Sequence, residues 1–241
     1  MLFKTRGIVL HHIKYAETSV IVTIYTELFG RQTYLINGVR SKKAKIKANI
    51  LQPLFLLDME VYHKPKRDLQ RVKEVQNNFI FNSLPYDIRK STVALFITEI
   101  LYKTIQELEP NSDLFLYLYN SIQVLDLKED GVTNFHLYFL IHLTKYLGFF
   151  PDNNYSESYA YFDLKVGSFV QIKPRHLFFI DADDSQAFSK LCVFSDNQHD
   201  KLKISSSSRI NILDKILDYY SLHNEGVSNV KSLSVLRDVF H

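Results

Sequence analysis

The residues with the clearest chemical potential lie in the stretch RSKKAKIK, Arg40 to Lys47, which carries five positive charges and no acidic residue. Lysine and arginine at this density can neutralise phosphates, although a charge run on its own is also typical of a solvated loop. Other cations lie before and after this stretch. The candidate phosphate-binding residues are Arg31, Arg40, Lys42, Lys43, Lys45, Lys47, Lys66, Arg67 and Arg71.

A second candidate is the acidic pair Asp58 and Glu60, which could together hold a divalent cation. A two-metal site needs more acidic ligands than this segment has, and the solvent side of an amphipathic strand shows the same pattern. We therefore predict no metal site. The seven glycines are never closer than eight residues apart, which excludes a glycine-rich nucleotide-binding loop. The sequence favours a binding protein over an enzyme.

The charges are divided unequally along the chain. Residues 1–80 hold 14 of the 29 Lys and Arg residues but 6 of the 26 Asp and Glu residues, a net charge of +8, which leaves −5 for the rest. Such a division suggests that the first part meets a polyanion. No segment resembles a signal peptide or a membrane span, so we expect a cytoplasmic protein. The single cysteine, Cys192, excludes an internal disulfide and a thiolate metal cluster.

The elements that must position the cations are strands. In LLDMEVY, the residues Leu57, Met59 and Val61 alternate with polar ones, the pattern of a half-buried strand. Breaks at glycine, asparagine and proline predict five strands, and five short strands in about 80 residues predict an OB-type barrel. The predicted strands are 3–14, 19–27, 31–39, 51–63 and 69–79. An OB barrel binds single strands with phosphates on cations and bases on rings, here Tyr25, Phe29, Tyr34 and Tyr62.

After Pro85 the apolar spacing becomes helical. A stripe from Val93 to Leu108 is stopped by Pro110, and further helices are predicted over 114–125 and from about 133 to Gly148. Residues 152–203 show no consistent periodicity, and fragments within them are typical of short strands and one helix. Helical spacing of apolar residues returns after this segment. We predict an α+β protein. Residues 1–81 form the barrel domain, and residues 82–241 form a helical domain with a small irregular insertion at about 152–203.

Short motifs along the whole chain resemble the RecO family of DNA recombination mediators. They are KTRGIVL, YAETS, TELFG, NGVRSK and LQP in the first 53 residues, and RINILDKILDYYSLH and KSLSVL near the end. The resemblance implies an OB domain, a helical domain and no bond chemistry. It implies binding to single- and double-stranded DNA, engagement of single-strand-binding protein and RecR, help in loading RecA at gaps, and strand annealing.

The chain departs from the family pattern at one point. Many family members carry paired Cys-x-x-Cys motifs that bind zinc after a Leu-Gly-Phe-x-Pro motif, but here LGFFP (147–151) is followed by YSES (155–158). We therefore expect no zinc or other cofactor. Tyr155, Tyr159, Tyr161 and Phe162 are expected to form an apolar substitute for the ion.

Binding the acidic, apolar tail of single-strand-binding protein needs cations beside an apolar pocket. Lys145, Lys173 and Arg175 are the candidates in the acidic helical part. Two alternatives stay open: an OB-fold RNA-binding factor, which would bind RNA as well as DNA, and a structural adaptor that meets an acidic protein.

Overall fold

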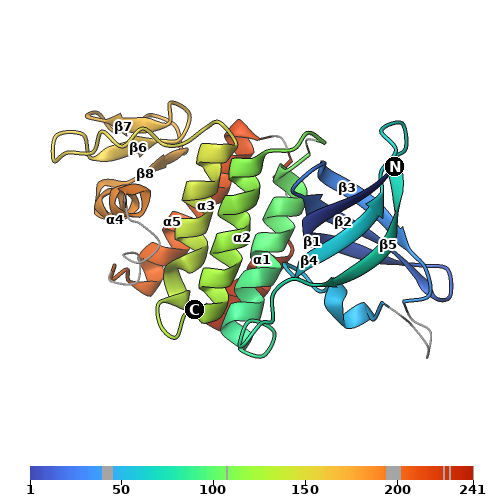
Figure 1. The fold of residues 1–241 in the computed structure, drawn as a ribbon. Helices are drawn as coiled ribbons and strands as arrows, with labels where there is room; N and C mark the ends of the chain where they lie inside the picture. The colour runs from blue at the N-terminus through green and yellow to red at the C-terminus, as the bar shows by residue number, and fades with distance from the viewer. Residues whose placement is uncertain (40–45, 107, 194–201, 225, 228, 241) are drawn as a thin grey trace. The chain divides into compact units, whose positions relative to one another are not determined.

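The structure is a computed structural model that describes residues 1–39, 46–106, 108–193, 202–224, 226–227 and 229–240. Arg40, Lys42, Lys43 and Lys45 of the predicted site lie outside the described residues. The described chain forms two compact units, Met1–Asn82 with Thr98–Gln123, and Ser83–Ile97 with Val124–His241. The predicted fold class, a five-stranded barrel followed by a helical part, is confirmed (Figure 1).

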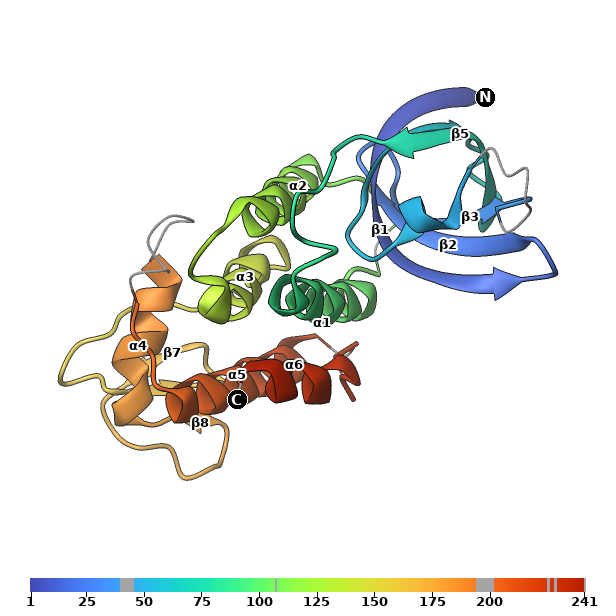
Figure 2. The same ribbon diagram turned by 90° about the horizontal axis from the view of Figure 1, so that it is seen from below.

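The barrel contains five strands: β1 (Leu2–Tyr15), β2 (Ser19–Thr26), β3 (Gly30–Ile36), β4 (Leu56–Tyr62) and β5 (Leu69–Asn77). They close in the order β1-β2-β3-β5-β4, and the view of Figure 2 shows the strands curving around the barrel interior. Only β3 and β5 pair in parallel among these neighbours. The predicted alternation holds, since Leu57, Met59 and Val61 are buried. The fourth strand begins later than predicted because residues 48–51 form a short 3-10 helix.

Helix α1 spans Ile88–Thr104 and α2 spans Ser112–Leu127, and both contribute residues to each unit. The predicted helical stripe ran to Leu108, but α1 ends at Thr104. Arg31 supplies a physical reason: its Nη1 donates to the carbonyl oxygens of Tyr102 at 2.7 Å and Ile105 at 2.6 Å. These bonds satisfy carbonyl groups that are left without partners at a helix C-terminus.

Gly30, the first residue of β3, lies close to the segment between α1 and α2. Its φ is +59°, and a Cβ added there would lie 2.4 Å from the carbonyl oxygen of Glu109. Both the backbone conformation and the close approach therefore require glycine at this position.

The second unit contains α3 (Val132–Tyr146), α4 (Ala182–Val193), α5 (Ser206–His223) and α6 (Ser232–Phe240). Helix α3 is buried on nearly all sides and packs against α4 and α5. Tyr220 on α5 is fully buried, and its hydroxyl donates to the carbonyl oxygen of Leu140 at 2.6 Å. No helix in the described residues is both long and apolar enough to cross a membrane.

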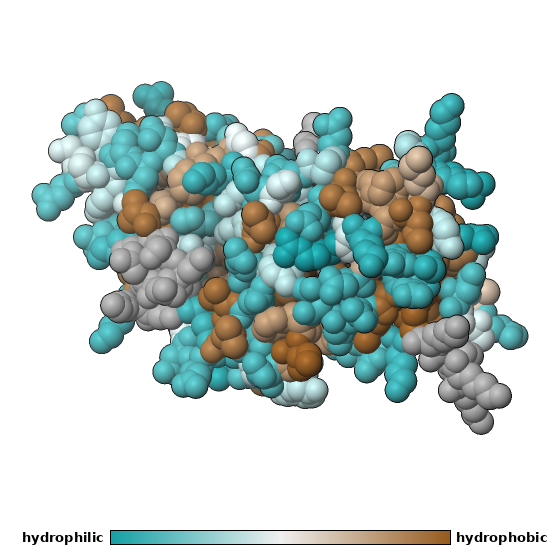
Figure 3. Space-filling view, in the orientation of Figure 1, coloured by the Kyte–Doolittle hydropathy of each residue, from teal (hydrophilic) through white to brown (hydrophobic). Residues whose placement is uncertain are grey.

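The insertion is more regular than predicted. It forms a three-stranded sheet of β6 (Tyr161–Asp163), β7 (Ser168–Val170) and β8 (Phe179–Ile180), next to which α4 packs. Phe162 is fully buried, and its ring meets those of Phe169, Phe188 and Tyr219. Tyr159 is 44% exposed, so the expectation that it belongs to the apolar substitute for the ion was wrong. Figure 3 shows hydrophobic side chains among the hydrophilic ones on the surface of this sheet.

Candidate nucleic-acid interface

The described cations of the predicted site lie on the barrel unit. Lys47 precedes the 3-10 helix, Lys66 and Arg67 lie in the β4–β5 loop, and Arg71 lies on β5; all four are exposed. Arg31 on β3 is only partly exposed. The β4–β5 hairpin therefore brings three predicted cations, Lys66, Arg67 and Arg71, together within six residues.

Gln70, which the sequence analysis did not single out, fixes the shape of the β4–β5 loop. It is 2% exposed, and its Nε2 donates to the carbonyl oxygens of Lys64 at 2.9 Å and Arg67 at 2.6 Å. Its Oε1 accepts from the backbone N–H of Lys64 at 3.0 Å. Burial of a glutamine cannot be read from the sequence, so no local pattern indicated this role.

Arg31 and Arg67 line the same cavity of about 630 Å³, together with the stacked rings of Phe29 and His63, whose centroids are 4.0 Å apart. The Arg31 guanidinium lies 4.5 Å from the ring centroid of Tyr102, in addition to its bonds with the end of α1. Burial lowers the pKa of Arg31 from its ordinary value. Arg31 thus has a structural role that its sequence position did not indicate.

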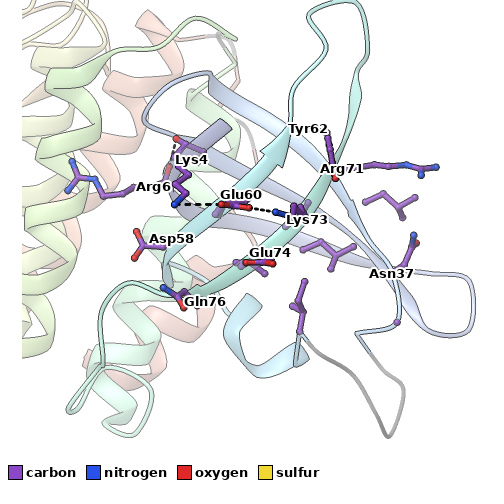
Figure 4. A pocket seen from close by; sticks show the side chains of 18 of the residues that line it. Lys4, Arg6, Asn37, Asp58, Glu60, Tyr62, Arg71, Lys73, Glu74 and Gln76 are labelled. Atoms are coloured by element: carbon purple, nitrogen blue, oxygen red, sulfur yellow. Dashed lines mark hydrogen bonds and ion pairs between the residues drawn. The ribbon is translucent and has the colours of Figure 1, made fainter. Parts of the chain in front are cut away.

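A larger groove of about 1070 Å³ lies along β1, β3, β4 and β5, and Figure 4 shows its polar lining. Glu60 accepts from Lys73 at 2.8 Å and lies 3.7 Å from Lys4. The hydrogen bond from Lys73 is the main cause of the lowered pKa of Glu60. Arg6 and Glu27 form a second pair at 2.6 Å. Three of the four cations that line this groove, Lys4, Arg6 and Lys73, therefore already lie against a carboxylate.

The candidate metal ligands Asp58 and Glu60 do share one strand face, but their carboxylates have other partners. Asp58 accepts from the amide of Asn78 at 2.9 Å, and Glu60 pairs with Lys73. Within the described ranges, no group of three or more His, Cys, Asp and Glu side chains is placed to hold a metal ion. Cys192 is buried, and burial raises the pKa of its thiol.

Of the four aromatic residues expected to be available for bases, one is well exposed. Tyr62 is 45% exposed, whereas Tyr25 and Tyr34 are at most 1% exposed. The expectation was wrong for these two: the Tyr25 ring lies near Phe115 on α2, and Tyr34 points into the barrel core. Phe29 is partly buried, packed between Phe3 and His63.

The three candidate tail-binding cations lie on the second unit. Lys145 is exposed on the last turn of α3, while Lys173 and Arg175 are exposed between β7 and β8. Lys173 pairs with Asp181 at 2.6 Å. Ile172 and Leu177, which flank the two cations in sequence, are each 82% exposed. The loop thus presents apolar and cationic side chains together.

Comparisons with known proteins agree along the whole chain. The family model described as Recombination protein O N terminal matches residues 1–79, and Recombination protein O C terminal matches residues 85–157. The DNA repair protein RecO of Bacteroides fragilis is 39% identical over 241 residues, and that of Azobacteroides pseudotrichonymphae is 37% identical over 240. The RecO of Porphyromonas gingivalis is 30% identical over 247 residues. Each match covers 100% of both chains.

Proposed function

Since the chain belongs to the recombination protein O (RecO) family, we propose that it acts as a recombination mediator whose barrel, residues 1–81, binds single- and double-stranded DNA. It is a DNA repair and recombination protein, and its family consists of mediators and not of enzymes. In the proposed role it works in the cytoplasm, associated with the nucleoid.

The observation that carries the DNA-binding proposal is the cluster of exposed cations on the β4–β5 hairpin. Lys66, Arg67 and Arg71 are exposed there, and Gln70 holds the loop that presents the first two. Lys47 and the basic stretch with Arg40, Lys42, Lys43 and Lys45 supply further phosphate contacts in our proposal. Arg31, which lines the same cavity as Arg67, also contributes to DNA binding in our proposal.

The proposed mechanism is electrostatic capture without bond chemistry. Lysine and arginine side chains displace counterions from the phosphates. On duplex DNA, the logarithm of the binding constant therefore falls by about 0.9 per contact for each tenfold rise in salt concentration. With about six contacts, the affinity falls about a thousandfold between about 50 and 200 mM salt. Bound in this way, the protein brings DNA to single-strand-binding protein and RecR, helps RecA to load at gaps, and promotes strand annealing.

The helical part, residues 82–241, receives the protein partners in our proposal. The acidic, apolar tail of single-strand-binding protein fits a surface that combines cations with exposed apolar groups. Lys173 and Arg175 beside Ile172 and Leu177 support this assignment, and residues 164–178 contain no acidic residue. Lys145 is the third candidate. Because Cys192 is the sole cysteine, we also propose that the insertion folds on its aromatic core without zinc.

The experiment is a titration of fluorescent single-stranded DNA, duplex DNA and matched RNA at several salt concentrations. The chain is compared with a variant carrying Lys42→Ala, Lys43→Ala and Lys45→Ala. We expect the slope of the binding constant against salt to flatten by about two to three units. An unchanged slope would show that the basic stretch does not contact DNA. Equal or tighter binding to RNA than to DNA would favour the RNA-binding alternative, and no nucleic-acid binding at moderate salt would favour a protein adaptor.

A further inference from the structure

A row of outward-facing side chains crosses four strands of the barrel. The register pairs Tyr62 on β4 with Arg71 on β5, Arg71 with Leu35 on β3, and Leu35 with Ile21 on β2. Side chains at paired positions of neighbouring strands lie next to one another on the same face. The residues that precede Tyr62 and Leu35 are buried in the barrel core, so the row faces outward.

The members of this row combine an aromatic ring, aliphatic groups and a cation. Tyr62 is 45% exposed, Arg71 is exposed, and Leu35 and Ile21 are partly exposed. Tyr62, Arg71 and Leu35 line the same groove, and Figure 4 shows the first two on adjacent strands. Rings bind the faces of unpaired bases and guanidinium groups bind phosphates, so the row offers contacts for both parts of one nucleotide.

Arg71 differs from the other cations of the groove. Lys4 and Lys73 lie against Glu60, and Arg6 pairs with Glu27. In the part of the chain that the structure describes, Arg71 forms no ion pair with a carboxylate. Because the other three cations already lie against carboxylates, they are less available to a row of phosphates than Arg71 is. The groove is therefore suited to a base beside Tyr62, with the phosphate at Arg71.

We infer that Tyr62 stacks on an unpaired base of single-stranded DNA while Arg71 binds the adjoining phosphate. This inference rests on the proposed DNA-binding function. It adds a contact that single-stranded DNA can make and duplex DNA cannot. A base inside a duplex already stacks on its neighbours, whereas an unpaired base has a free face for the ring. Tyr62 therefore contributes to the binding of single strands and not to the binding of duplex, while the cations of the loop serve both.

Two substitutions of Tyr62 test the inference by affinity. Tyr62→Ala is expected to weaken binding of a single-stranded oligonucleotide by about tenfold, with duplex affinity and the salt slope unchanged. Tyr62→Phe, which keeps the ring, is expected to retain wild-type affinity. Tyr159→Ala is the matched control, because Tyr159 is 44% exposed and lies in the insertion. Circular dichroism of each variant checks that the barrel is folded.

A fluorescence measurement tests contact directly. The chain contains no tryptophan, so Tyr62→Trp and Tyr159→Trp each create a single reporter. We expect single-stranded DNA to quench the reporter of Tyr62→Trp and not that of Tyr159→Trp. Wild-type single-strand affinity in the folded Tyr62→Ala variant, or an unquenched reporter in Tyr62→Trp protein that has bound DNA, would overturn the inference and leave the electrostatic proposal intact. Absence of salt-sensitive DNA binding by the unmodified chain would overturn both.

Discussion

Gln70 and Lys64 are joined by two hydrogen bonds across the β4–β5 loop. The backbone N–H of Lys64 donates to Gln70 Oε1 at 3.0 Å, and Gln70 Nε2 donates back to the carbonyl oxygen of Lys64 at 2.9 Å. A further bond to the carbonyl oxygen of Arg67 closes the turn. A buried core residue thus holds the loop that carries Lys66 and Arg67, which links barrel packing to the proposed DNA surface.

The Gln70→Ala variant tests this link. The three lost hydrogen bonds leave backbone groups that water can partly satisfy, so we expect a loss of about 1–3 kcal/mol in the free energy of unfolding. DNA affinity is expected to fall severalfold because Lys66 and Arg67 lose their fixed positions. Denaturant unfolding and a DNA titration measure the two effects. Gln171→Ala, at an exposed position of the insertion, should change neither quantity; unaltered DNA binding by Gln70→Ala would refute the link.

Arg31→Lys separates structure from DNA binding at one position. Lysine keeps the charge but cannot reproduce the flat guanidinium that bonds two carbonyl oxygens and lies over Tyr102. We expect the free energy of unfolding to fall by about 1–3 kcal/mol, with little change in the salt slope of DNA binding. Unchanged stability of Arg31→Lys would contradict the structural role, because its guanidinium contacts with Tyr102 and Ile105 would then contribute nothing. Thermal unfolding and the salt titration distinguish these results.

Local sequence patterns predicted much of the fold, and the wrong predictions have a common physical cause. Period-two alternation around Met59 predicted strands, and helical spacing predicted α1, because each depends on near neighbours. The end of α1 depends on Arg31, which is 71 residues from Tyr102 in sequence. Likewise, Tyr25 is covered by residues near Asn111, a contact that no local pattern reports. The hydrogen bonds of Gln70 are local, but its burial in the barrel cannot be read from the sequence, so the sequence predicted the cations but not what positions them.

Glu60→Gln is expected to increase DNA affinity. The substitution releases Lys4 and Lys73 from their shared carboxylate, so single-stranded DNA should bind more tightly, with a salt slope steeper by about one unit. Glu157→Gln, an exposed change in the insertion, is the control for an equal change in net charge. An identical effect of both variants would show that the groove itself makes no contribution.

The ion pairs of Glu60 should make the stability of the folded state depend on pH. Because Lys73 and Lys4 lower the pKa of Glu60 below its ordinary 4.5, its ion pairs stabilise the folded state above about pH 4.5. This contribution is lost as the pH falls through the lowered pKa. Unfolding measured between about pH 6 and pH 3 should therefore show a weaker acid dependence for Glu60→Gln than for the unmodified chain. Identical pH profiles would contradict the assignment.

The insertion should depend on its aromatic core and not on metal. Phe162→Ala removes a fully buried ring from a cluster of three others, and we expect a loss of about 3–5 kcal/mol in stability. Tyr159→Ala, at a 44% exposed position, should cost far less. A chelator should not change the unfolding midpoint. Stoichiometric zinc in protein purified in metal-replete medium would contradict the proposal.

We propose that DNA binds the cations of the barrel part and not the candidate tail-binding cations of the helical part. The most direct test is the salt slope of single-stranded DNA binding for two triple variants, one with Lys42, Lys43 and Lys45 changed to Ala and one with Lys145, Lys173 and Arg175 changed to Ala. We predict that the first flattens the slope by about two units, at about 0.7 per contact, while the second leaves it unchanged. Equal slopes for both variants, or a loss confined to the second, would contradict the account.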